Sequence, residues 1–427
     1  MGTELERVIK ELELRPMMPD GPMNLDRMKA AVRRIFESVG ELDPDRVIVV
    51  AGTNGKGSTC ATLETLLLSA SQKVALYTSP HLTKITERIR INGEEISEEE
   101  FCFAYTNVLP LLAELGLTHF EMLTAMAVFV FCSARPRLDY FIFEVGLGGT
   151  WDATNAVPHS INVITALGLD HQNLLGDTLQ SVAANKFGIV GKCSAVIHTE
   201  LSDSLTDLIN RTKHSTMSNW TNAPKYDVYV EKCNGEPVFY VESKWGRAEI
   251  TLPGLRGAEN TNLALSVFEQ LGFDPRSHLG FVKTVKWPGR MEKVSDPGFK
   301  CPIYLSGDHN PQGVKSLIEL LKHYKWERLH LLIGIGRDKD FRSMLEMFSA
   351  LPNVSIYLTE TPYRGLTVEE YDNANPSVLG LWKDPVVALK EIQDKVGIND
   401  LIIVTGSLYL VGLLRPRFKE AFFRPSV

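Results

Sequence analysis

The chain has 427 residues, of which 44% are hydrophobic and 23% charged, and its formal net charge is −7 at pH 7. This length exceeds one ordinary core and predicts two or three domains. The acidic balance argues against a nucleic-acid partner, and no apolar run reaches the ~20 residues that span a bilayer, which argues against a membrane partner. Scattered cysteines and a charged N-terminus without a signal-peptide core predict a cytoplasmic protein with reduced thiols.

Strand-like and helix-like patterns alternate along the first part of the chain. Apolar runs typical of buried parallel strands lie at residues 46–50, 73–80, 138–146 and 161–168. Helical spacing is found after the first run and again at 98–115, 119–134 and 178–190. Such alternation predicts βαβ units, and ligands are expected beyond the carboxyl ends of the strands.

The second part of the chain begins with a different pattern. Residues 226–243 alternate on either side of Asn234-Gly235, which predicts a β-hairpin. Proline and glycine at 295–302 predict a domain boundary, and a second α/β alternation follows it. The predicted fold class is α/β. A P-loop ATPase-type domain with a mainly parallel sheet and a small antiparallel insertion covers 1–295, and a smaller Rossmann-like domain covers 296–427.

A glycine-rich stretch, AGTNGKGST at 51–59, separates the first apolar run from the first helical one. Backbone N–H groups of such a loop and a helix N-terminus cradle phosphate, and Lys56 would reach the terminal phosphates. The stretch departs from GxxxxGK[ST], because Val50 stands at the first glycine and Gly57 separates Lys56 from Ser58. A purely structural strand-to-helix turn is the alternative.

Polar residues end the strands that follow. Ser79 ends the second run, Glu144 lies at the end of the third, and Asp170 and His171 come after the fourth. Mg²⁺ binds oxygen ligands and keeps waters, so one carboxylate, one hydroxyl and nucleotide phosphates suffice to hold it. The alternatives are a carboxylate that caps a loop and, for His171, an ordinary hydrogen-bonded loop residue.

Several motifs occur in a fixed order between about residues 46 and 412. They are VAGTNGKGST, YTSPHL, ERIRING, EVGLGG with DATN, GLDH with LGDTL, WPGRME, HNP and GSLYLVG. Together they resemble the folylpolyglutamate synthase / dihydrofolate synthase family, which belongs to the Mur-ligase-like amide-forming ATPases. TSPHL, ERIRING and GSLYLVG point to the folate branch.

The resemblance implies an ATP-dependent ligase. Such an enzyme activates the carboxylate of dihydropteroate or of a reduced folate as an acyl phosphate, which the amino group of L-glutamate then attacks. The implied cofactors are ATP and two Mg²⁺ ions, and we expect a monomer. By the same resemblance, Asn54 and Gly55 with the rest of the loop hold the ATP phosphates. Ser79 and Glu144 hold one Mg²⁺, and His171 holds the second.

Further roles follow from the resemblance alone. Lys186 falls on the lysine that is carbamylated in the family, and a carbamate would convert a cation into an oxygen ligand. Without the resemblance, Lys186 would be an ordinary solvated helix lysine. Asn260 and Arg290 fall on nucleotide-contacting positions, and Arg290 suits the charge that develops on a transferring phosphoryl group. Asp308 and His309 are assigned to the nucleotide as well.

Three chain segments are implied in binding the pterin. One lies at residues 22–27, one comprises Thr118, His119, Phe120 and Glu121, and one comprises Trp151, Asp152 and Ala153. Phe120 and Trp151 would stack on a flat heterocycle, while Glu121 or Asp152 would pair with its amino groups. The alternative for Phe120, which begins a nearly apolar helix, is a place in the core.

The chain departs from the family pattern at several positions near these ligands. Ser306 stands at the position of a family aspartate, and Asp308 stands at a family alanine. Thr150 replaces an arginine, Asn185 a glutamate, and Phe187 an alanine. These changes bear on substrate preference and catalytic strength more than on the fold.

Two other functions stay open at this point. A Mur-type ligase that acts on a nucleotide-sugar peptide is one, although only about 45 residues precede the glycine-rich loop, too few for the additional N-terminal domain of such ligases. The other is a nucleotide-binding P-loop protein that has lost its ligase activity. The substitutions at 306, 185 and 150 are compatible with this hypothesis, because they lie near the implied ligands.

Overall fold

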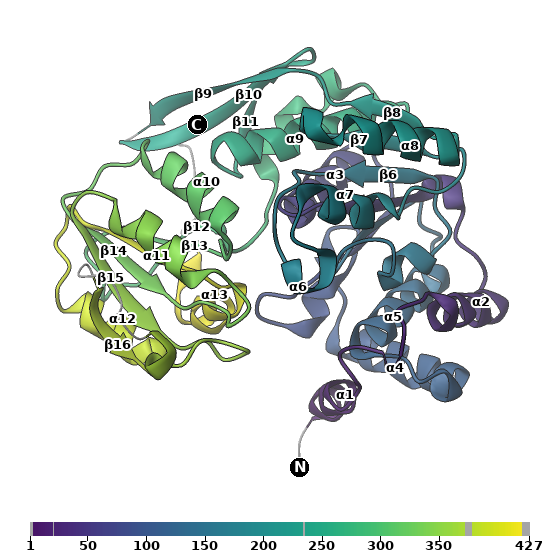
Figure 1. The fold of residues 1–427 in the computed structure, drawn as a ribbon, viewed down its shortest axis with the longest axis horizontal. Coiled ribbons are helices and arrows are strands. Elements are labelled where there is room, and N and C mark those ends of the chain that lie inside the picture. The colour runs from purple at the N-terminus through teal and green to yellow at the C-terminus, as the bar shows by residue number, and fades with distance from the viewer. Residues whose placement is uncertain (1–2, 20, 234, 372–377, 421–427) are drawn as a thin grey trace. The chain divides into compact units, whose positions relative to one another are not determined.

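A computed structural model describes residues 3–19, 21–233, 235–371 and 378–420. The chain forms two compact units (Figure 1). Unit 1 comprises Met1–Asp227, Val241–Glu249 and Glu259–Val285, and unit 2 comprises Val228–Tyr240, Ile250–Ala258 and Lys286–Val427. Each unit has its own sheet with helices, which confirms the predicted α/β class.

The sheet of unit 1 has eight strands in the order β4-β3-β2-β5-β1-β6-β7-β8. Central β1 pairs in parallel with β5 and β6, whereas β3 pairs antiparallel with β2. β1 and β5 are buried along their whole length, as the continuous apolar runs predict. The bounds are β1 (Val47–Ala51), β2 (Val74–Tyr77), β3 (Ile89–Ile91), β4 (Glu94–Glu95), β5 (Tyr140–Glu144), β6 (Ile161–Ile164), β7 (Ala195–His198) and β8 (Asn219–Asn222).

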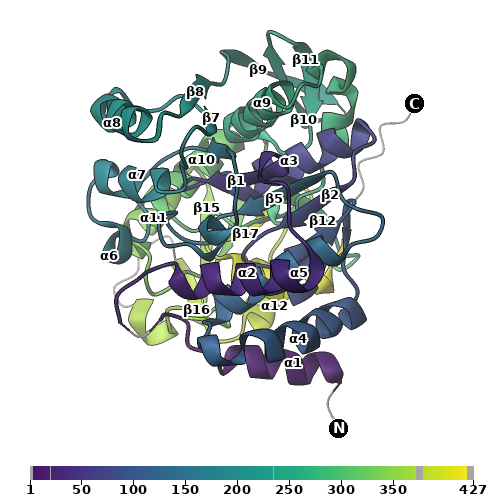
Figure 2. The same ribbon diagram turned by 90° about the vertical axis from the view of Figure 1, so that its right-hand side faces the viewer.

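Helices cover this sheet. The nearly apolar α5 is largely buried and packs against α2 and α4, and α1 packs against α4 (Figure 2). This layer places the start of α5 near the loop that follows α1, because the backbone N–H of His119 donates to the Pro16 carbonyl oxygen. The bounds are α1 (Glu4–Glu13), α2 (Asp26–Val39), α3 (Lys56–Ser69), α4 (Glu98–Leu112), α5 (His119–Ser133), α6 (Gln172–Leu175), α7 (Leu179–Phe187) and α8 (Thr206–Thr216).

A three-stranded sheet in the order β11-β10-β9 precedes the long helix α9 (Gly254–Gln270). Its strands are β9 (Tyr226–Cys233), β10 (Glu236–Ser243) and β11 (Gly246–Ile250). The first two are the predicted hairpin strands, and they are neighbours in the sheet. Asn234, on which the turn was predicted, lies outside the described residues.

The sheet of unit 2 has seven strands in the order β16-β15-β14-β17-β13-β12-β18. β13, β17, β14, β15 and β16 pair in parallel, and β12 pairs antiparallel with β13 and β18. Because β12 belongs to this sheet, unit 2 includes Lys286 onward, whereas the predicted second domain starts at residue 296. The strands are β12 (Arg290–Ser295), β13 (Ile303–Ser306), β14 (Leu329–Ile333), β15 (Val354–Thr359), β16 (Val378–Trp382), β17 (Leu401–Thr405) and β18 (Lys419–Glu420).

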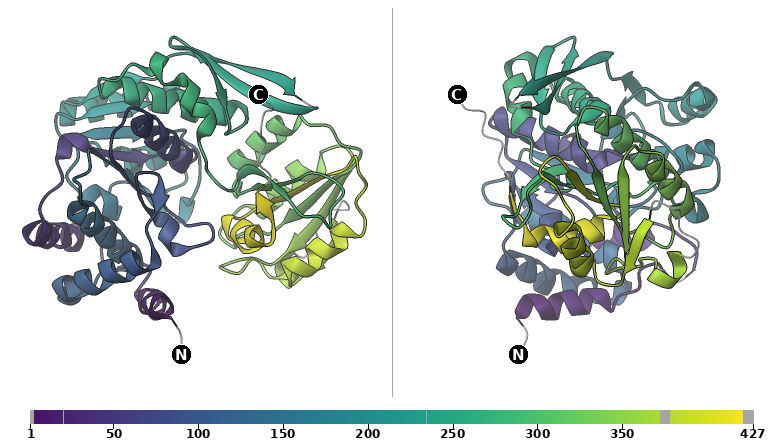
Figure 3. Two further views of the ribbon diagram at one scale, coloured as in Figure 1. Left: turned by 180° about the vertical axis from the view of Figure 1, so that it is seen from behind. Right: turned by 90° about the vertical axis from the view of Figure 1, so that its left-hand side faces the viewer.

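Four α-helices accompany the sheet of unit 2, drawn in green and yellow in Figure 3. They are α10 (Pro311–Leu321), α11 (Phe341–Ser349), α12 (Pro385–Gln393) and α13 (Leu408–Leu414). Asn310 caps α10 by accepting the Gly313 backbone N–H at 2.8 Å. Among the described residues, no helix of the protein has the length and apolar character needed to cross a bilayer.

Candidate active site

The glycine-rich loop follows β1 and ends at the start of α3. Gly55, the N-cap of α3, has φ +90°, and a Cβ there would lie 2.2 Å from Oδ1 of Asn260 on α9. Asn260 is 2% exposed, and its Oδ1 has no hydrogen-bond partner among the described residues. Only glycine therefore fits this bend, and it brings a buried, unsatisfied carboxamide oxygen against the loop.

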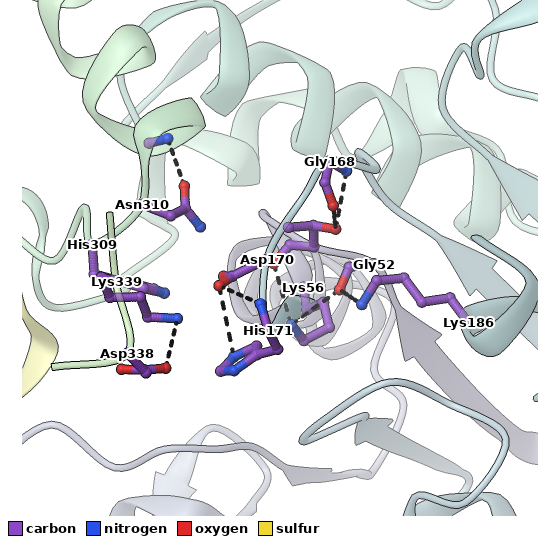
Figure 4. Close-up of polar contacts among 12 residues, drawn as sticks. Gly52, Lys56, Gly168, Asp170, His171, Lys186, His309, Asn310, Asp338 and Lys339 are labelled. Carbon is purple, nitrogen blue, oxygen red and sulfur yellow. Dashed lines mark hydrogen bonds and ion pairs between the residues drawn. The ribbon is translucent and has the colours of Figure 1, made fainter. Parts of the chain in front are cut away.

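Two lysines converge on one carbonyl oxygen of this loop (Figure 4). Nζ of Lys56 donates to the Gly52 oxygen at 3.2 Å, and Nζ of Lys186 donates to the same oxygen at 2.9 Å. Lys186 is 5% exposed, and burial, with help from the charge of Lys56, lowers its pKa to about 7. A sizeable fraction of this amine is therefore neutral and nucleophilic at neutral pH.

Ser79 and Glu144 meet at the carboxyl ends of neighbouring strands β2 and β5. The backbone N–H of Ser79 donates to Oε2 of Glu144 at 3.1 Å, and Glu144 is buried. The described residues contain no group of three or more His, Cys, Asp and Glu that would hold an ion by themselves. One carboxylate beside one hydroxyl-bearing residue nevertheless fits Mg²⁺ that also keeps waters and phosphate oxygens.

His171 follows β6 and caps the short helix α6 with a left-handed backbone, at φ 50°. Its backbone N–H donates to Oδ1 of Asp170 at 2.9 Å, and its Nε2 lies 4.0 Å from the same oxygen (Figure 4). The side chain of His171 is 37% exposed. The predicted ligand is thus accessible beside a carboxylate whose charge also acts on buried Lys186.

The predicted pterin segment at the start of α5 is held by hydrogen bonds. Thr118 and Glu121 form a capping box, in which the Thr118 backbone N–H donates to Oε2 of Glu121 at 2.8 Å. The other oxygen of Glu121 accepts from Arg27 at 3.2 Å. Nδ1 of His119 lies 3.0 Å from the Leu12 carbonyl oxygen, and burial lowers the His119 pKa. The Glu121 carboxylate therefore already has partners within the fold.

The remaining pterin residues differ in exposure. Trp151 is 46% exposed, whereas Ala153 is 3% exposed. Phe120 lies over the backbone that follows β5, since a Cβ on Gly146 would come within 2.6 Å of its ring. Asp152 is buried, and it accepts from the Leu147 N–H at 2.9 Å and from the Thr154 N–H at 3.0 Å. Burial raises the pKa of Asp152, and these hydrogen bonds oppose the rise.

In unit 2, the predicted nucleotide residues gather where β12 begins and β13 ends. Nη1 of Arg290 donates to the Gly307 carbonyl oxygen at 3.2 Å, and Nδ1 of His309 lies 2.9 Å from that oxygen. Oγ of Ser306 donates to Oδ2 of Asp308 at 2.7 Å. Two of the residues that depart from the family pattern, Ser306 and Asp308, are therefore directly hydrogen-bonded to each other.

The sequence assigned no role to Arg88, which the structure buries in unit 1. Arg88 ends the short 3-10 helix Ile85–Arg88, is 8% exposed, and donates from Nε to Nδ1 of His81 at 2.9 Å. Burial and the Arg88 charge lower the His81 pKa to about 3. The motif ERIRING contains Arg88, but no local pattern in it distinguishes Arg88 from Arg90.

Comparisons with known proteins identify relatives of this chain. The family model for the Mur ligase glutamate ligase domain matches residues 289–408. A dihydrofolate synthase/folylpolyglutamate synthase of Bacillus subtilis is 30% identical over 415 residues, which cover 92% of this chain and 95% of that protein.

Solved structures show the same architecture. Folylpolyglutamate synthase of Mycobacterium tuberculosis, in crystal structures with ADP and AMPPCP, superposes with a TM-score of 0.83 at 25% identity over 97% of this chain and 98% of that chain. A bifunctional folylpolyglutamate synthase/dihydrofolate synthase with Mn, AMPPNP and L-glutamate bound gives a TM-score of 0.81 at 27% identity over 97% and 98%.

Proposed function

The chain belongs to the dihydrofolate synthase/folylpolyglutamate synthase family, and from that premise we infer that it is an ATP-dependent ligase that adds L-glutamate to a folate precursor or a folate. Its acceptors are dihydropteroate, a (poly)glutamyl reduced folate, or both. The observation that carries this inference within the molecule is the convergence of Lys56 and Lys186 on the Gly52 oxygen, in the glycine-rich loop that follows a buried parallel strand.

The chemistry divides into two steps. The substrate carboxylate attacks the γ-phosphorus of ATP, which gives an acyl phosphate and ADP. The amine of glutamate then attacks the acyl carbon, phosphate leaves, and the ammonium loses a proton, which gives the amide. The glycine-rich loop and Lys56 would hold the phosphates of ATP. In unit 2, Arg290, Asp308 and His309 would contact the nucleotide, and Arg290 would stabilise charge on the transferring phosphoryl group.

Divalent ions are part of this proposal. Ser79 and Glu144 would hold one Mg²⁺, and His171 would hold a second. Bound there, the ions would neutralise phosphate charge. The hydrogen bond between Ser79 and Glu144 supports the first assignment, because it fixes a carboxylate and a hydroxyl-bearing residue at one edge of the sheet.

We also propose that Lys186 is carbamylated. The neutral amine would attack carbon dioxide, forming an N–C bond and releasing a proton, and the product would present oxygen atoms instead of an ammonium. A lysine that is 5% exposed and has a pKa lowered to about 7 supplies the neutral amine that this reaction requires. The carbamate would offset part of the positive charge of Lys56 and of a nearby metal ion.

The pterin would lie against Phe120 and Trp151, near Thr118, His119 and Ala153. Glu121 and Asp152 already accept hydrogen bonds from within the chain, so their part would be to shape the pocket as well as to face the ligand. A monomeric state and a cytoplasmic location stay predictions from the sequence.

The test is ADP release by purified protein that is offered ATP, Mg²⁺ and glutamate with either dihydropteroate or a reduced folate. We expect release to require both glutamate and one of these acceptors, and the product to gain the mass of one glutamyl residue. ADP release only with a nucleotide-sugar peptide acceptor would favour the Mur-type ligase. Nucleotide binding without turnover would favour a P-loop protein that has lost its ligase activity.

A further inference from the structure

Arg88 is a buried cation that lacks a counter-charge in the part of the chain that the structure describes. It is 8% exposed, and no carboxylate among the described residues forms an ion pair with it. Two residues further along, Arg90 does have a partner, since its Nη2 lies 3.0 Å from Oε2 of buried Glu64. Proteins pair their buried charges because an unpaired one carries a large desolvation cost. The same short segment therefore holds one neutralised arginine and one that lacks its anion.

The groups around Arg88 carry no negative charge that would neutralise it. Its Nε donates to Nδ1 of His81, so that ring nitrogen accepts and has no proton of its own. The Tyr77 hydroxyl, an uncharged phenol, also faces the guanidinium. Asp152 acts on Tyr77 from nearby, but its carboxylate accepts hydrogen bonds from Leu147 and Thr154.

The location of Arg88 indicates which anion is missing. Its carbonyl oxygen accepts from the Thr78 N–H at 2.9 Å, and Thr78 directly precedes Ser79. On the other side, the ring of Tyr77 lies 6.0 Å from that of Phe120, centroid to centroid. The backbone of Arg88 is thus bonded to the residue before Ser79, and its guanidinium faces Tyr77, whose ring contacts Phe120, the residue against which the pterin is proposed to lie.

We propose that Arg88 binds the carboxylate of the pteroate or folate substrate, the group that becomes phosphorylated, and that His81 positions the guanidinium for this contact. The proposal rests on the proposed function. A planar guanidinium matches a carboxylate in a two-pronged hydrogen bond. The phosphates of ATP have the glycine-rich loop and Lys56, whereas Arg88 belongs to the segment between β2 and β3.

The experiment compares two ligands and several variants without requiring turnover. Binding of dihydropteroate and of its carboxamide analogue is measured by calorimetry with wild type, Arg88→Gln and Arg88→Lys. We expect wild type to prefer the carboxylate by roughly 10- to 100-fold, the range that a hydrogen-bonded charge pair contributes. Arg88→Gln should lose this preference, and Arg88→Lys, which keeps the buried charge but not the planar fork, should retain part of it.

Arg90→Gln is the matched control. It removes a buried arginine from the same segment and leaves Glu64 unpaired, so it should lower the unfolding temperature but keep the carboxylate preference. His81→Ala should weaken the preference by a smaller factor, because the guanidinium loses its Nε partner. Unfolding temperatures of all variants separate lost recognition from lost folding, and if Arg88→Gln does not fold, the comparison rests on Arg88→Lys.

Each outcome decides something. An Arg88→Gln variant that keeps the full carboxylate preference overturns the proposal, as does an Arg88→Lys variant with an unchanged preference where it alone folds. A variant that loses ATP affinity instead would assign Arg88 to the nucleotide and would also overturn it. If wild type ligates glutamate but shows no carboxylate preference, the role of Arg88 is wrong and the proposed function stands. If wild type neither binds nor ligates any pteroate or folate, both the proposed function and the role of Arg88 are wrong.

Discussion

Two buried polar clusters, one in each unit, allow the proposed ligand site to be compared with a cluster that is satisfied within the fold. In unit 2, His330 is 1% exposed and its Nε2 lies 3.2 Å from Oδ2 of Asp400, whose carboxylate also accepts from the Arg328 and Gly397 backbones. In unit 1, Lys56 and Lys186 share one carbonyl oxygen, and Oδ1 of Asn260 has no partner among the described residues.

The difference lies in how completely each cluster satisfies its own charges and polar atoms. Around His330 the donors and acceptors match, and the cluster lies at the amino-terminal ends of β14 and β17, away from the edge where α/β proteins bind ligands. Around the glycine-rich loop, positive charge and unsatisfied atoms collect at the carboxyl end of β1. A fold tolerates this arrangement when a ligand completes it. Substitutions around the glycine-rich loop should therefore lower activity, whereas substitutions around His330 should lower stability alone.

The largest effect should come from the glycine-rich loop and the neighbouring strand end. Lys56→Ala and Glu144→Ala should each reduce kcat by about 10³-fold or more, because the transferred phosphoryl group loses positioning and charge compensation. ADP release measures the loss, and circular dichroism should show an unchanged fold. Lys73→Ala, which changes an exposed lysine just before β2, is the control and should keep full activity. A Glu144→Ala variant with an unchanged ligation rate would contradict the assignment of Glu144 as a Mg²⁺ ligand.

Lys186→Ala should reduce kcat by roughly 10²-fold, and short-chain carboxylates should restore part of the activity by standing in for the carbamate. The exposed Lys192→Ala is the matched control. Because burial lowers the pKa of Lys186 to about 7, the neutral amine becomes abundant as the pH rises through that value. Wild-type activity should therefore rise over the same interval when carbon dioxide is limiting. If no carboxylate restores the activity of Lys186→Ala, the carbamate proposal is wrong and Lys186 has a structural role.

A smaller effect is expected from the pair Ser306 and Asp308. Asp308→Ala should lower kcat/KM for ATP by about 10-fold, and Ser306→Ala by less, because the carboxylate remains but loses a hydrogen bond. The double variant Ser306→Asp with Asp308→Ala moves the carboxylate to the family position and should recover most of the activity. A double variant as impaired as Asp308→Ala alone would show that the carboxylate position is not interchangeable.

The smallest effect on activity should come from the internally satisfied cluster. His330→Ala should leave kcat and KM unchanged but lower the free energy of unfolding by about 2 kcal/mol, because the Asp400 carboxylate loses a hydrogen-bond partner. Burial lowers the pKa of His330, which is 1% exposed, and the pKa of Asp400 is lowered by its hydrogen bonds against the opposing effect of burial.

Both groups have depressed pKa values in the folded protein, so both contributions are present at neutral pH and are lost on acidification. The loss should start below about pH 6.5, where the histidine of the unfolded chain takes up a proton. Chemical denaturation of wild type and His330→Ala at several pH values measures it. A His330→Ala variant that is stable but inactive would contradict the contrast between the two clusters.

The sequence predicted those features that are encoded locally. The run that became β1, the glycine-rich loop and the helix after it follow one another in the chain, and the alternating residues of β9 and β10 indicated a strand pair without any tertiary information. The polar residues at the ends of the predicted parallel strands also indicated that Ser79 and Glu144 would lie at one sheet edge. Their contact follows from the pairing of β2 with β5 in a parallel sheet.

Features that depend on tertiary packing were not predictable. Lys186 alone has the sequence appearance of a solvated helix lysine, and its burial arises because α7 packs against the glycine-rich loop, where the amine meets the Gly52 oxygen. Arg88 and Arg90 look alike in the sequence, and only the fold shows that Glu64 neutralises one of them. β12 was assigned to the first domain because its antiparallel partner lies beyond the proline- and glycine-rich break.

The most direct measurement for the central claim follows one oxygen atom. Dihydropteroate, or the reduced folate that proves to be the acceptor, is labelled with oxygen-18 in its carboxylate and incubated with the protein, ATP and glutamate. If the carboxylate is phosphorylated before glutamate attacks, each amide bond formed should transfer one labelled oxygen to the released phosphate. Amide formation with unlabelled phosphate would contradict the acyl phosphate route and, with it, the assignment of this sheet edge as a ligase active site.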